Sequence, residues 1–275
     1  MTQGPSVDPA VAKYYADAPE ESRLTEGAAL LEAARTRELI QRLAPSPPAV
    51  VFDIGGGAGA YSFWLAELGY EVHLIDAAPR LIAEAARRDS GHTLASCKVG
   101  DARSLDLPDE GADVVLMLGP LYHLTAGADR AKALAEAARV LKPGGWFFGA
   151  VISRWASALD GLARELFEDP RFTVIMERDL AEGQHRNPTE RLDYFTTAYL
   201  HRPADAVAEA MAAGLVEARI YGIEGPGWLL ADAGERMNDP RRQGYLMDVA
   251  RRLESEPAVQ GVSAHLLVVA RKPAP

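Results

Sequence analysis

The stretch Val50-Val51-Phe52-Asp53-Ile54-Gly55-Gly56-Gly57-Ala58-Gly59 decides the fold of this 275-residue chain. Its apolar first half predicts a buried strand over 49–54, and the glycines predict a tight turn into a helix over 60–68. Glycine adopts positive φ without steric penalty and lets a ligand approach the backbone closely. A helix that starts behind such a turn offers backbone N–H groups to that ligand. The stretch therefore predicts a ligand-binding turn at the end of a strand.

A second apolar run, Val72-His73-Leu74-Ile75, ends in Asp76, about twenty residues beyond the turn. An acid at this point accepts hydrogen bonds from both hydroxyls of a ribose, which implies an adenosine-type cofactor. A dinucleotide site spaces its glycines G-x-G-x-x-G, whereas this chain has G-x-G-x-G with Asp53 two residues before Gly55. A lone glycine motif is weak evidence. The downstream sequence therefore has to decide whether the turn binds a dinucleotide or another adenosine-type cofactor.

The downstream sequence continues as alternating strands and helices. A third strand is expected over 96–101 with Asp101 at its end, and a fourth over 112–118 runs into Gly119-Pro120-Leu121-Tyr122-His123-Leu124. A helix over 128–141 is stopped by Lys142-Pro143-Gly144-Gly145 and is followed by a fifth, almost wholly apolar strand over 145–152. Such alternation predicts a parallel, doubly wound α/β sheet with its ligand at the carboxyl ends of the strands.

The four motifs within 49–153 resemble, in order and spacing, those of the class I S-adenosylmethionine-dependent methyltransferases. The resemblance implies a mostly parallel, seven-stranded Rossmann-like sheet with S-adenosylmethionine as cofactor and S-adenosylhomocysteine as product. It implies that Asp53 helps to hold the ammonium group of the cofactor and that Asp101 accepts a hydrogen bond from the adenine amine. The implied cofactor-binding residues are Asp53, Gly55, Gly57, Gly59, Asp76, Ala77, Asp101, Ala102, Leu118, Gly119, Tyr15 and Arg23.

The remaining sequence divides around this core. Residues 1–45 are expected to form an N-terminal helical lid, broken near Gly27, and 46–153 the cofactor-binding core. Residues 154–200, which begin with a helix over 156–167, interrupt the regular alternation and are expected to form a cap over the substrate cavity. Residues 201–275 are expected to complete the sheet with a helix over 203–213 and strands over 215–223 and 264–270, while 224–260, with a helix over 241–254, forms a substrate wall.

Composition narrows the possible partners. The net charge is −10, with 29 basic against 39 acidic side chains, which argues against nucleic acid because its binders present basic surfaces. No apolar run approaches the ~20 residues that span a bilayer, and the polar N-terminus lacks a signal core, so no membrane and a cytoplasmic location are expected. The single cysteine, Cys97, excludes an internal disulfide and a multi-cysteine zinc site. The sequence does not decide whether the chain forms a homodimer.

The loop after the fourth strand is where related enzymes place groups beside the transferred methyl. Here Gly119-Pro120-Leu121-Tyr122-His123 departs from the D/N-P-P-Y/F pattern of enzymes that methylate nucleobase or glutamine amides. It also lacks an acid for a magnesium site, so no metal is expected. The pattern is similar to small-molecule methyltransferases with a histidine here, glycine N-methyltransferase among them. His123 is either a general base or a residue that orders the loop or contacts the cofactor.

Other polar and aromatic residues complete the list of candidates. The catalytic candidates are His123, Tyr122 and His185, and the substrate-binding candidates are Tyr14, Arg186, Tyr199, His201 and Trp228.

The whole chain resembles uncharacterised actinobacterial small-molecule methyltransferases, a resemblance that does not identify the substrate. The expected function is metal-independent methyl transfer to an N or O atom of a small metabolite. The alternatives are a catalytically idle S-adenosylmethionine-binding module and an enzyme acting on a peptide or RNA.

Overall fold

A computed structural model describes residues 8–17, 24–89, 91, 93–189 and 191–274. The strands are β1 (Val50–Ile54), β2 (Glu71–Asp76), β3 (Ser96–Val99), β4 (Ala112–Met117), β5 (Leu141–Ser153), β6 (Gln184–His185), β7 (Ala198–His201), β8 (Val216–Gly222) and β9 (His265–Arg271). The helices are α1 (Pro9–Asp17), α2 (Ala29–Leu43), α3 (Ala60–Glu67), α4 (Pro79–Arg88), α5 (Pro120–His123), α6 (Gly127–Val140), α7 (Ala156–Ala163), α8 (Pro170–Glu182), α9 (Pro203–Ala212), α10 (Ala233–Met237) and α11 (Pro240–Leu253). None of these described helices is both long and apolar enough to cross a lipid bilayer.

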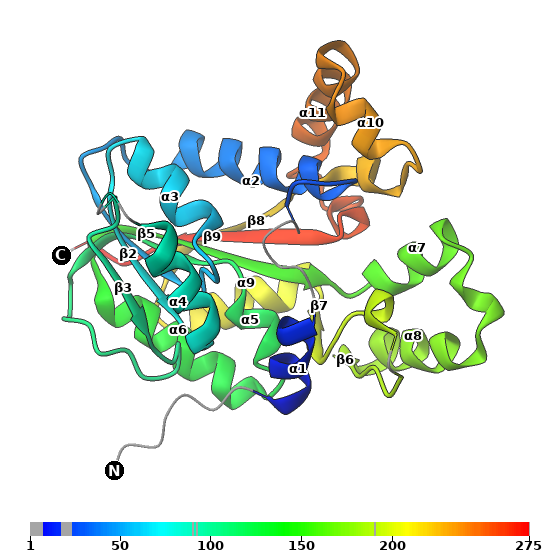
Figure 1. Cartoon of the computed structure of the whole chain (residues 1–275), viewed down its shortest axis with the longest axis horizontal. Coiled ribbons are helices and arrows are strands. Elements are labelled where there is room, and N and C mark those ends of the chain that lie inside the picture. Colours follow the sequence, from blue (N-terminus) through cyan, green and yellow to red (C-terminus); the bar gives the residue numbers. More distant parts are fainter. Residues whose placement is uncertain (1–7, 18–23, 90, 92, 190, 275) are drawn as a thin grey trace.

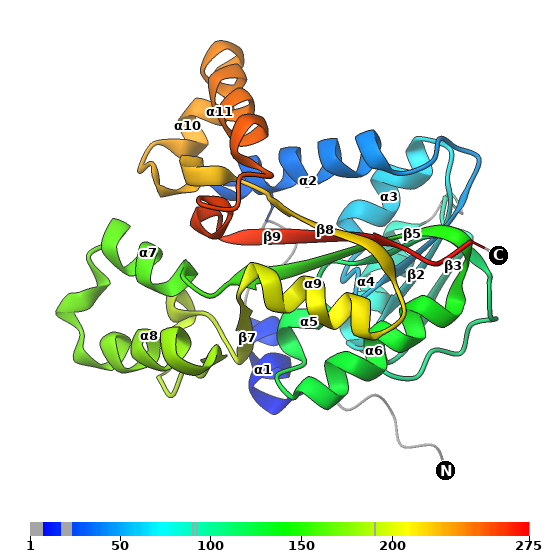
Figure 2. The same cartoon turned by 180° about the vertical axis from the view of Figure 1, so that it is seen from behind.

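A single sheet lies between two layers of helices (Figures 1 and 2). Strands β3, β2, β1, β4 and β5 are neighbours in this order and are all parallel. Strand β9 pairs with β5 in the antiparallel sense, and β8 pairs in turn with β9. The expected α/β fold with a mostly parallel, doubly wound sheet is confirmed, and the final antiparallel strand lies where 264–270 was predicted.

The sheet has nine strands in the described residues, two more than expected. The additional strands, β6 and β7, are short and come from the segment after β5. Strand β5 extends beyond the end of β4, and its last residues, Ile152 and Ser153, pair with Leu200 and His201 of β7. An edge left open by a longer neighbour offers unpaired backbone groups, which a further strand satisfies. The third strand also ends earlier than predicted, at Val99.

Alternate side chains of the central strands pack against the two helical layers. Phe147 and Val151 of β5 join the core beneath α6 and α9, whereas Phe148 and Ala150 face α2, α3 and α4. All four side chains are almost fully buried. Burial on both faces explains why this strand is apolar almost throughout.

The N-terminal residues do not form one lid. Helix α2 packs on the sheet beside α3, and its Leu39 and Ile40 are buried in the core. Helix α1 lies instead at the carboxyl edge of the sheet (Figure 1). The break falls near Gly27, which has φ +58°, as the sequence predicted.

The segment after β5 forms a lobe that projects from the end of the sheet, with α7 and α8 in it (Figure 1). The helix expected over 156–167 ends at Ala163, and a short 3₁₀ helix follows at Leu166–Glu168. Asp179 is fully buried in the lobe and accepts hydrogen bonds from Ser157 Oγ and His185 Nδ1. This polar network holds α7, α8 and β6 together.

Helix α2 is anchored by a buried arginine. The Arg35 side chain has no solvent exposure and pairs with Glu254 at the end of α11 and with Glu38. Its Nε also donates to the Ile223 carbonyl oxygen at 3.2 Å. These bonds attach α2 to the C-terminal part of the chain.

Replacing Arg35 by alanine is expected to reduce the free energy of unfolding by about 3 kcal/mol, because the largely buried Glu254 loses its buried partner and keeps only Arg42, which is 38% exposed. Urea denaturation measures the change. Arg251→Ala is the matched control: it removes an arginine bound to the same Glu38, but that arginine is 45% exposed, so a loss of at most about 1 kcal/mol is expected. Equal losses in the two variants would contradict this interpretation.

Candidate active site

A cavity of about 440 Å³ lies at the carboxyl edge of the parallel strands. This volume is in the range of small-molecule sites. Its walls come from the turn after β1, the ends of β2 and β4, and helices α1, α2, α4 and α5. The predicted residues in these walls are Asp53, Gly55, Gly57, Asp76, Ala77, Asp101, Ala102, Leu118, Gly119, Tyr15, Tyr122 and His123. Gly59 lies behind the turn, and Arg23 is outside the described residues.

The glycine turn has the backbone that the sequence predicted. Gly55, Gly57 and Gly59 have φ of +74°, +59° and +84°. A Cβ on Gly55 would lie 2.4 Å from Pro120 Cγ, so the turn and α5 approach too closely for any side chain. Gly56 was not selected from the sequence, yet a Cβ there would lie 2.5 Å from Asp53 Oδ2. The turn therefore requires glycine for packing as well as for positive φ.

Asp53 is a buried acid at the floor of the cavity. Its Oδ2 accepts a hydrogen bond from Ser62 Oγ at 2.6 Å, whereas Oδ1 has no hydrogen-bond partner among the described residues. Burial, with a smaller contribution from the nearby Asp76 carboxylate, raises the pKa of Asp53 to about 6, although the Ser62 hydrogen bond opposes the shift. A cation at Oδ1 would stabilise the ionised form, as the ammonium of an amino acid would.

Asp76 joins the turn to β2. Its Oδ2 accepts from the Gly57 N–H and its Oδ1 from the Ala78 N–H, both at 2.8 Å. Burial raises the pKa of this carboxyl above its ordinary value despite these two hydrogen bonds. The side chain thus carries a charge in a largely dry wall, where it is suited to accept hydrogen bonds from ligand hydroxyls.

Asp101 lies at the other end of the same wall. Arg103 binds its carboxylate through Nε at 2.9 Å and Nη2 at 2.7 Å, and the Arg103 backbone N–H adds a third bond. Arg103 also reaches Asp129 at the start of α6. The pairing fixes the orientation of Asp101 at the cavity, and no sequence motif indicates it.

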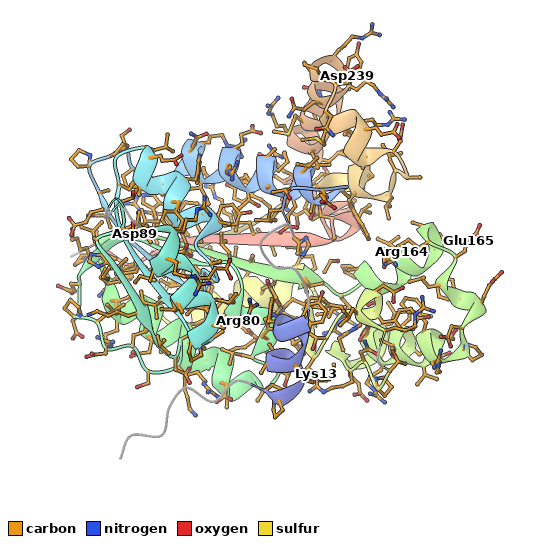
Figure 3. The ribbon with its side chains drawn as sticks, viewed as in Figure 1. Lys13, Arg80, Asp89, Arg164, Glu165 and Asp239 are labelled. Atoms are coloured by element: carbon orange, nitrogen blue, oxygen red, sulfur yellow. The ribbon has the colours of Figure 1, made fainter. Side chains whose placement is uncertain are left out.

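Tyr15 and His123 meet at the wall of the cavity. His123 Nδ1 lies 3.1 Å from the Thr197 carbonyl oxygen, which only accepts, so this nitrogen carries a proton. In the neutral ring Nε2 is then the acceptor, and the Tyr15 hydroxyl donates to it at 2.7 Å. Arg80 extends toward α1 (Figure 3) and donates to the Tyr15 carbonyl oxygen, which holds the tyrosine in place.

Arg37 of α2 is a cavity residue that the sequence analysis missed. Its Nε is buried and has no hydrogen-bond partner among the described residues, and its guanidinium lies 5.6 Å from the centre of the Trp64 ring. An arginine in an amphipathic helix far from any motif carries no sequence signal. Only the packing of α2 on the sheet brings it beside the glycine turn.

Of the eight expected catalytic and substrate-binding residues, six do not line the cavity. Both ring nitrogens of His185 are used inside the lobe, by Asp179 and by the Tyr194 carbonyl oxygen. The others are Tyr14, which contacts Tyr15 and Phe195; Arg186, bound to Gln184; Tyr199, stacked under Arg130; His201, bound to Glu209; and Trp228, which donates to the Val262 carbonyl oxygen. The expected cap, 154–200, and wall, 224–260, contribute no residue to the cavity lining in the described structure. The polar loops of these two segments were expected to face a substrate. Instead, the polar side chains named above form hydrogen bonds and ring contacts with other residues of the protein.

Comparison with known proteins identifies the class. Residues 52–149 match the family model described as "Methyltransferase domain". Over 146 residues the chain is 35% identical to a ubiquinone/menaquinone biosynthesis C-methyltransferase of Acidiphilium cryptum, and the match covers 50% of this chain and 55% of that protein. The chain spans about half the length of this curated relative.

Solved structures agree with the fold. A putative methyltransferase of Haloferax volcanii, determined with the Trm112 activator, has a TM-score of 0.62 at 18% identity over 98% of this chain and 100% of its own. A phosphoethanolamine N-methyltransferase of Haemonchus contortus, solved with S-adenosylhomocysteine, has a TM-score of 0.56 at 17% identity over 88% of this chain and 53% of its own. These structures show the fold, and the family-model match over residues 52–149 supports a methyltransferase domain of the S-adenosylmethionine-dependent class in that part of the chain, with S-adenosylmethionine as its cofactor.

The residues of the cavity fit this cofactor. Asp53 offers a buried carboxylate oxygen and Arg37 a partly exposed guanidinium with a buried Nε, which complement the ammonium and carboxylate of an amino acid. Asp76 and Asp101 stand further along the same wall, where acceptors for ribose hydroxyls and an adenine amine are needed.

Binding of S-adenosylhomocysteine is expected to weaken with falling pH, because its ammonium favours ionised Asp53, whose pKa is about 6 without ligand. Protonation of Asp53 below that pH must be reversed on binding, so Kd should rise about tenfold between pH 7 and pH 5. The raised pKa of Asp76 acts in the same direction. Calorimetry measures the profile, and a Kd that stays constant over this range would contradict the assignment.

Asp76→Ala is expected to weaken cofactor binding by more than tenfold, on the order of 1.4 kcal/mol, because charge-assisted hydrogen bonds are lost. Circular dichroism should show a retained fold. Asp89→Ala removes a carboxylate that bonds only to the backbone N–H groups of Thr93 and Leu94, outside the cavity, and should leave the affinity unchanged. Unchanged affinity in the Asp76 variant would remove this residue from the site.

Proposed function

We propose that the protein transfers a methyl group from S-adenosylmethionine to an N or O atom of a small metabolite by in-line displacement, without a metal at the reacting atoms. The observation that carries this proposal is the Tyr15–His123 hydrogen bond at the wall of the cofactor cavity. A purely cofactor-binding module has no need of a proton acceptor there. A methyltransferase whose acceptor atom carries a proton needs one.

The chain's own residues would position the cofactor. Asp53 would take its ammonium group and Arg37 its carboxylate, with Asp76 on the ribose and Asp101 on the adenine. The turn of Gly55 and Gly57 would allow the nucleoside to lie against the backbone. When bound, the cofactor supplies an electrophilic methyl on a sulfonium, so the protein has only to align the acceptor and remove its proton.

The Tyr15–His123 pair would move that proton. The acceptor's proton passes to the Tyr15 oxygen as the tyrosine proton passes to His123 Nε2, which leaves an imidazolium whose Nδ1–H remains bonded to the Thr197 carbonyl oxygen. This arrangement needs neutral His123 at the start of the reaction. Tyr122 packs against the His123 ring and would act by positioning it.

The comparisons support a small acceptor. The Acidiphilium relative is named for ubiquinone and menaquinone biosynthesis, and the Haemonchus structure contains phosphomonomethylethanolamine. The net charge of −10 also argues against a polyanionic partner. A second candidate is an enzyme that acts on RNA, because a probable tRNA methyltransferase 9B of Mus musculus is 32% identical to this chain over 115 residues.

A titration of S-adenosylmethionine and S-adenosylhomocysteine should precede any assay. A radiolabelled methyl donor would then be offered with a panel of quinols, catechols, primary amines and phosphoethanolamine, and separately with bulk tRNA. Label in a small molecule supports the proposal, and label only in tRNA favours the second candidate. Cofactor binding without transfer to any panel member would support an idle binding module.

With an acceptor from that panel, Tyr15→Phe is expected to lower kcat at least about 100-fold, because the general base loses its hydroxyl. The Kd of S-adenosylhomocysteine should change less than about threefold, and the Tyr15→Phe/His123→Ala double variant should be no slower than the worse single variant, since the two residues act as a unit. Tyr14→Phe, next in the chain but outside the cavity, is the control and should keep full activity. An active Tyr15→Phe enzyme would refute the relay.

A further inference from the structure

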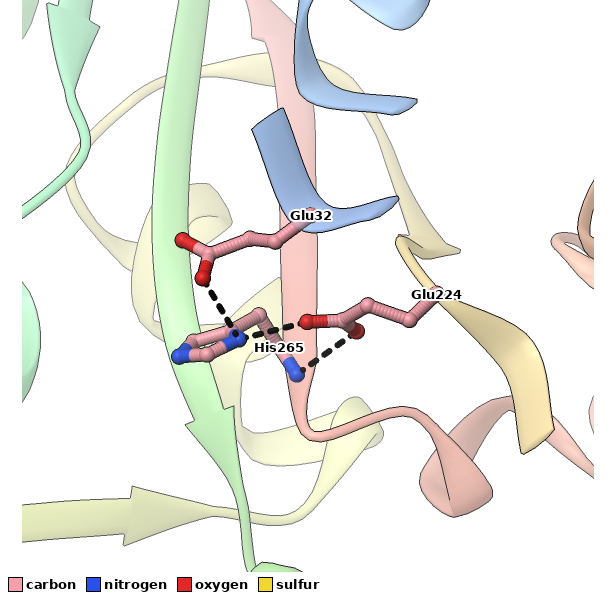
Figure 4. Close-up of side chains that lie close together, drawn as sticks. All are labelled: Glu32, Glu224 and His265. Carbon is pink, nitrogen blue, oxygen red and sulfur yellow. Dashed lines mark hydrogen bonds and ion pairs between the residues drawn. The ribbon is translucent and has the colours of Figure 1, made fainter. Parts of the chain in front are cut away.

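We propose that Glu32, Glu224 and His265 form a binding site for a divalent transition-metal ion of the zinc class. The three residues come from α2, from the segment after β8 and from the first position of β9, and Figure 4 shows their side chains converging. None of them lines the cofactor cavity. The proposal is therefore independent of the proposed methyl transfer.

Two carboxylates approach the same ring nitrogen. His265 Nδ1 lies 2.6 Å from Glu224 Oε1 and 3.7 Å from Glu32 Oε2. The three donor atoms of the cluster lie within 4.8 Å of one another. One proton on Nδ1 makes one good hydrogen bond, to Glu224, and leaves Glu32 at ion-pair distance.

A metal ion in place of that proton would bind all three donors. Zinc binds histidine nitrogen and carboxylate oxygen at about 2.0–2.2 Å, so tetrahedral ligand atoms lie roughly 3.3 Å apart. The observed separations of 2.6 and 3.7 Å lie on either side of this value, so small side-chain movements would complete the site. Three protein ligands leave a fourth position for water.

The charges and burial of the cluster also fit a cation. The Glu224 side chain is 2% exposed and that of Glu32 is 12% exposed, so two acids lie in a largely dry place around one imidazole. Buried carboxylates are stable when a cation or strong donors compensate their charge. The His265 backbone N–H donates to Glu224 Oε2 at 3.1 Å and so aims Oε1 at the ring, as a supporting hydrogen bond does for a metal ligand.

The donor atoms, one imidazole nitrogen and two carboxylate oxygens, indicate which metal would bind. Imidazole suits zinc and its neighbours among the transition metals, whereas magnesium and calcium are bound by oxygen alone. The bound ion would join the start of α2 to the amino end of β9, where His265 pairs with Ile152 at the end of the antiparallel strand β5. It would thereby fix the helix that carries Arg37.

The test uses tag-free, full-length protein treated with EDTA, dialysed, and saturated with S-adenosylhomocysteine so that the cavity acids are covered. Calorimetry with zinc chloride is expected to show one site with a micromolar or lower Kd. Zinc at 100 times Kd should raise Tm by several degrees, because an ion that binds only the folded state stabilises it. Magnesium and calcium at the same concentrations should produce neither effect.

His265→Ala and Glu224→Gln are expected to abolish zinc binding, and Glu32→Gln should weaken it at least tenfold. The Glu32→Gln variant keeps the His265–Glu224 hydrogen bond and is expected to fold. It therefore tests the zinc site even if the other two variants do not fold. His73→Ala is the control, because His73 also lies near a carboxylate, that of Glu71 at 3.4 Å, but the Glu71 side chain is 62% exposed and no second acid faces the ring at ion-pair distance in the described residues. Absence of zinc binding, or equal binding by the wild type and the Glu32→Gln variant, would overturn the proposal.

Discussion

Two carboxylates buried beside one glycine turn are the constraint on which this structure depends. Asp53 ends the apolar run of β1 and Asp76 ends β2, and the Gly57 N–H binds the second acid across the gap between the two strands. Both acids have raised pKa values because burial disfavours their charge. Ionising two buried carboxyl groups costs free energy when no ligand is bound. The rest of the fold therefore has to hold the edge of the sheet rigid around them.

The rigidity comes from close backbone packing. Pro120 of α5 lies against Gly55, and the Asp53 carboxylate and the Leu74 side chain lie against Gly56, so the turn has no room to relax. The two acids thus line the cavity while they remain largely buried against a packed core. Binding of a cationic amino-acid group would relieve the electrostatic strain, which makes the unliganded site predisposed toward such a ligand.

The far wall of the cavity is assembled from distant parts of the chain. Tyr15 comes from α1, His123 from the loop after β4, and the Thr197 carbonyl that fixes the histidine tautomer from the residues before β7. Arg37 is placed by α2, which Arg35 attaches to the end of α11. The segment between the lobe of α7 and α8 and β7 contacts the site through the Thr197 carbonyl oxygen and the Phe195 ring, both against His123, although it was expected to line the cavity itself.

Local sequence determined the parallel sheet, the positive-φ glycines and the acids at the ends of the first strands. These features depend on residues close in sequence, because strand periodicity, glycine conformation and the position after a strand are local properties. The tertiary structure alone decided the contacts between elements, among them the Tyr15–His123 bond, the position of Arg37 and the meeting of Glu32, Glu224 and His265. It also placed His185, Arg186 and Trp228 outside the lining of the cavity. A polar side chain in a loop has the same sequence signal whether it faces a ligand or a neighbouring backbone, and only packing in three dimensions separates the two.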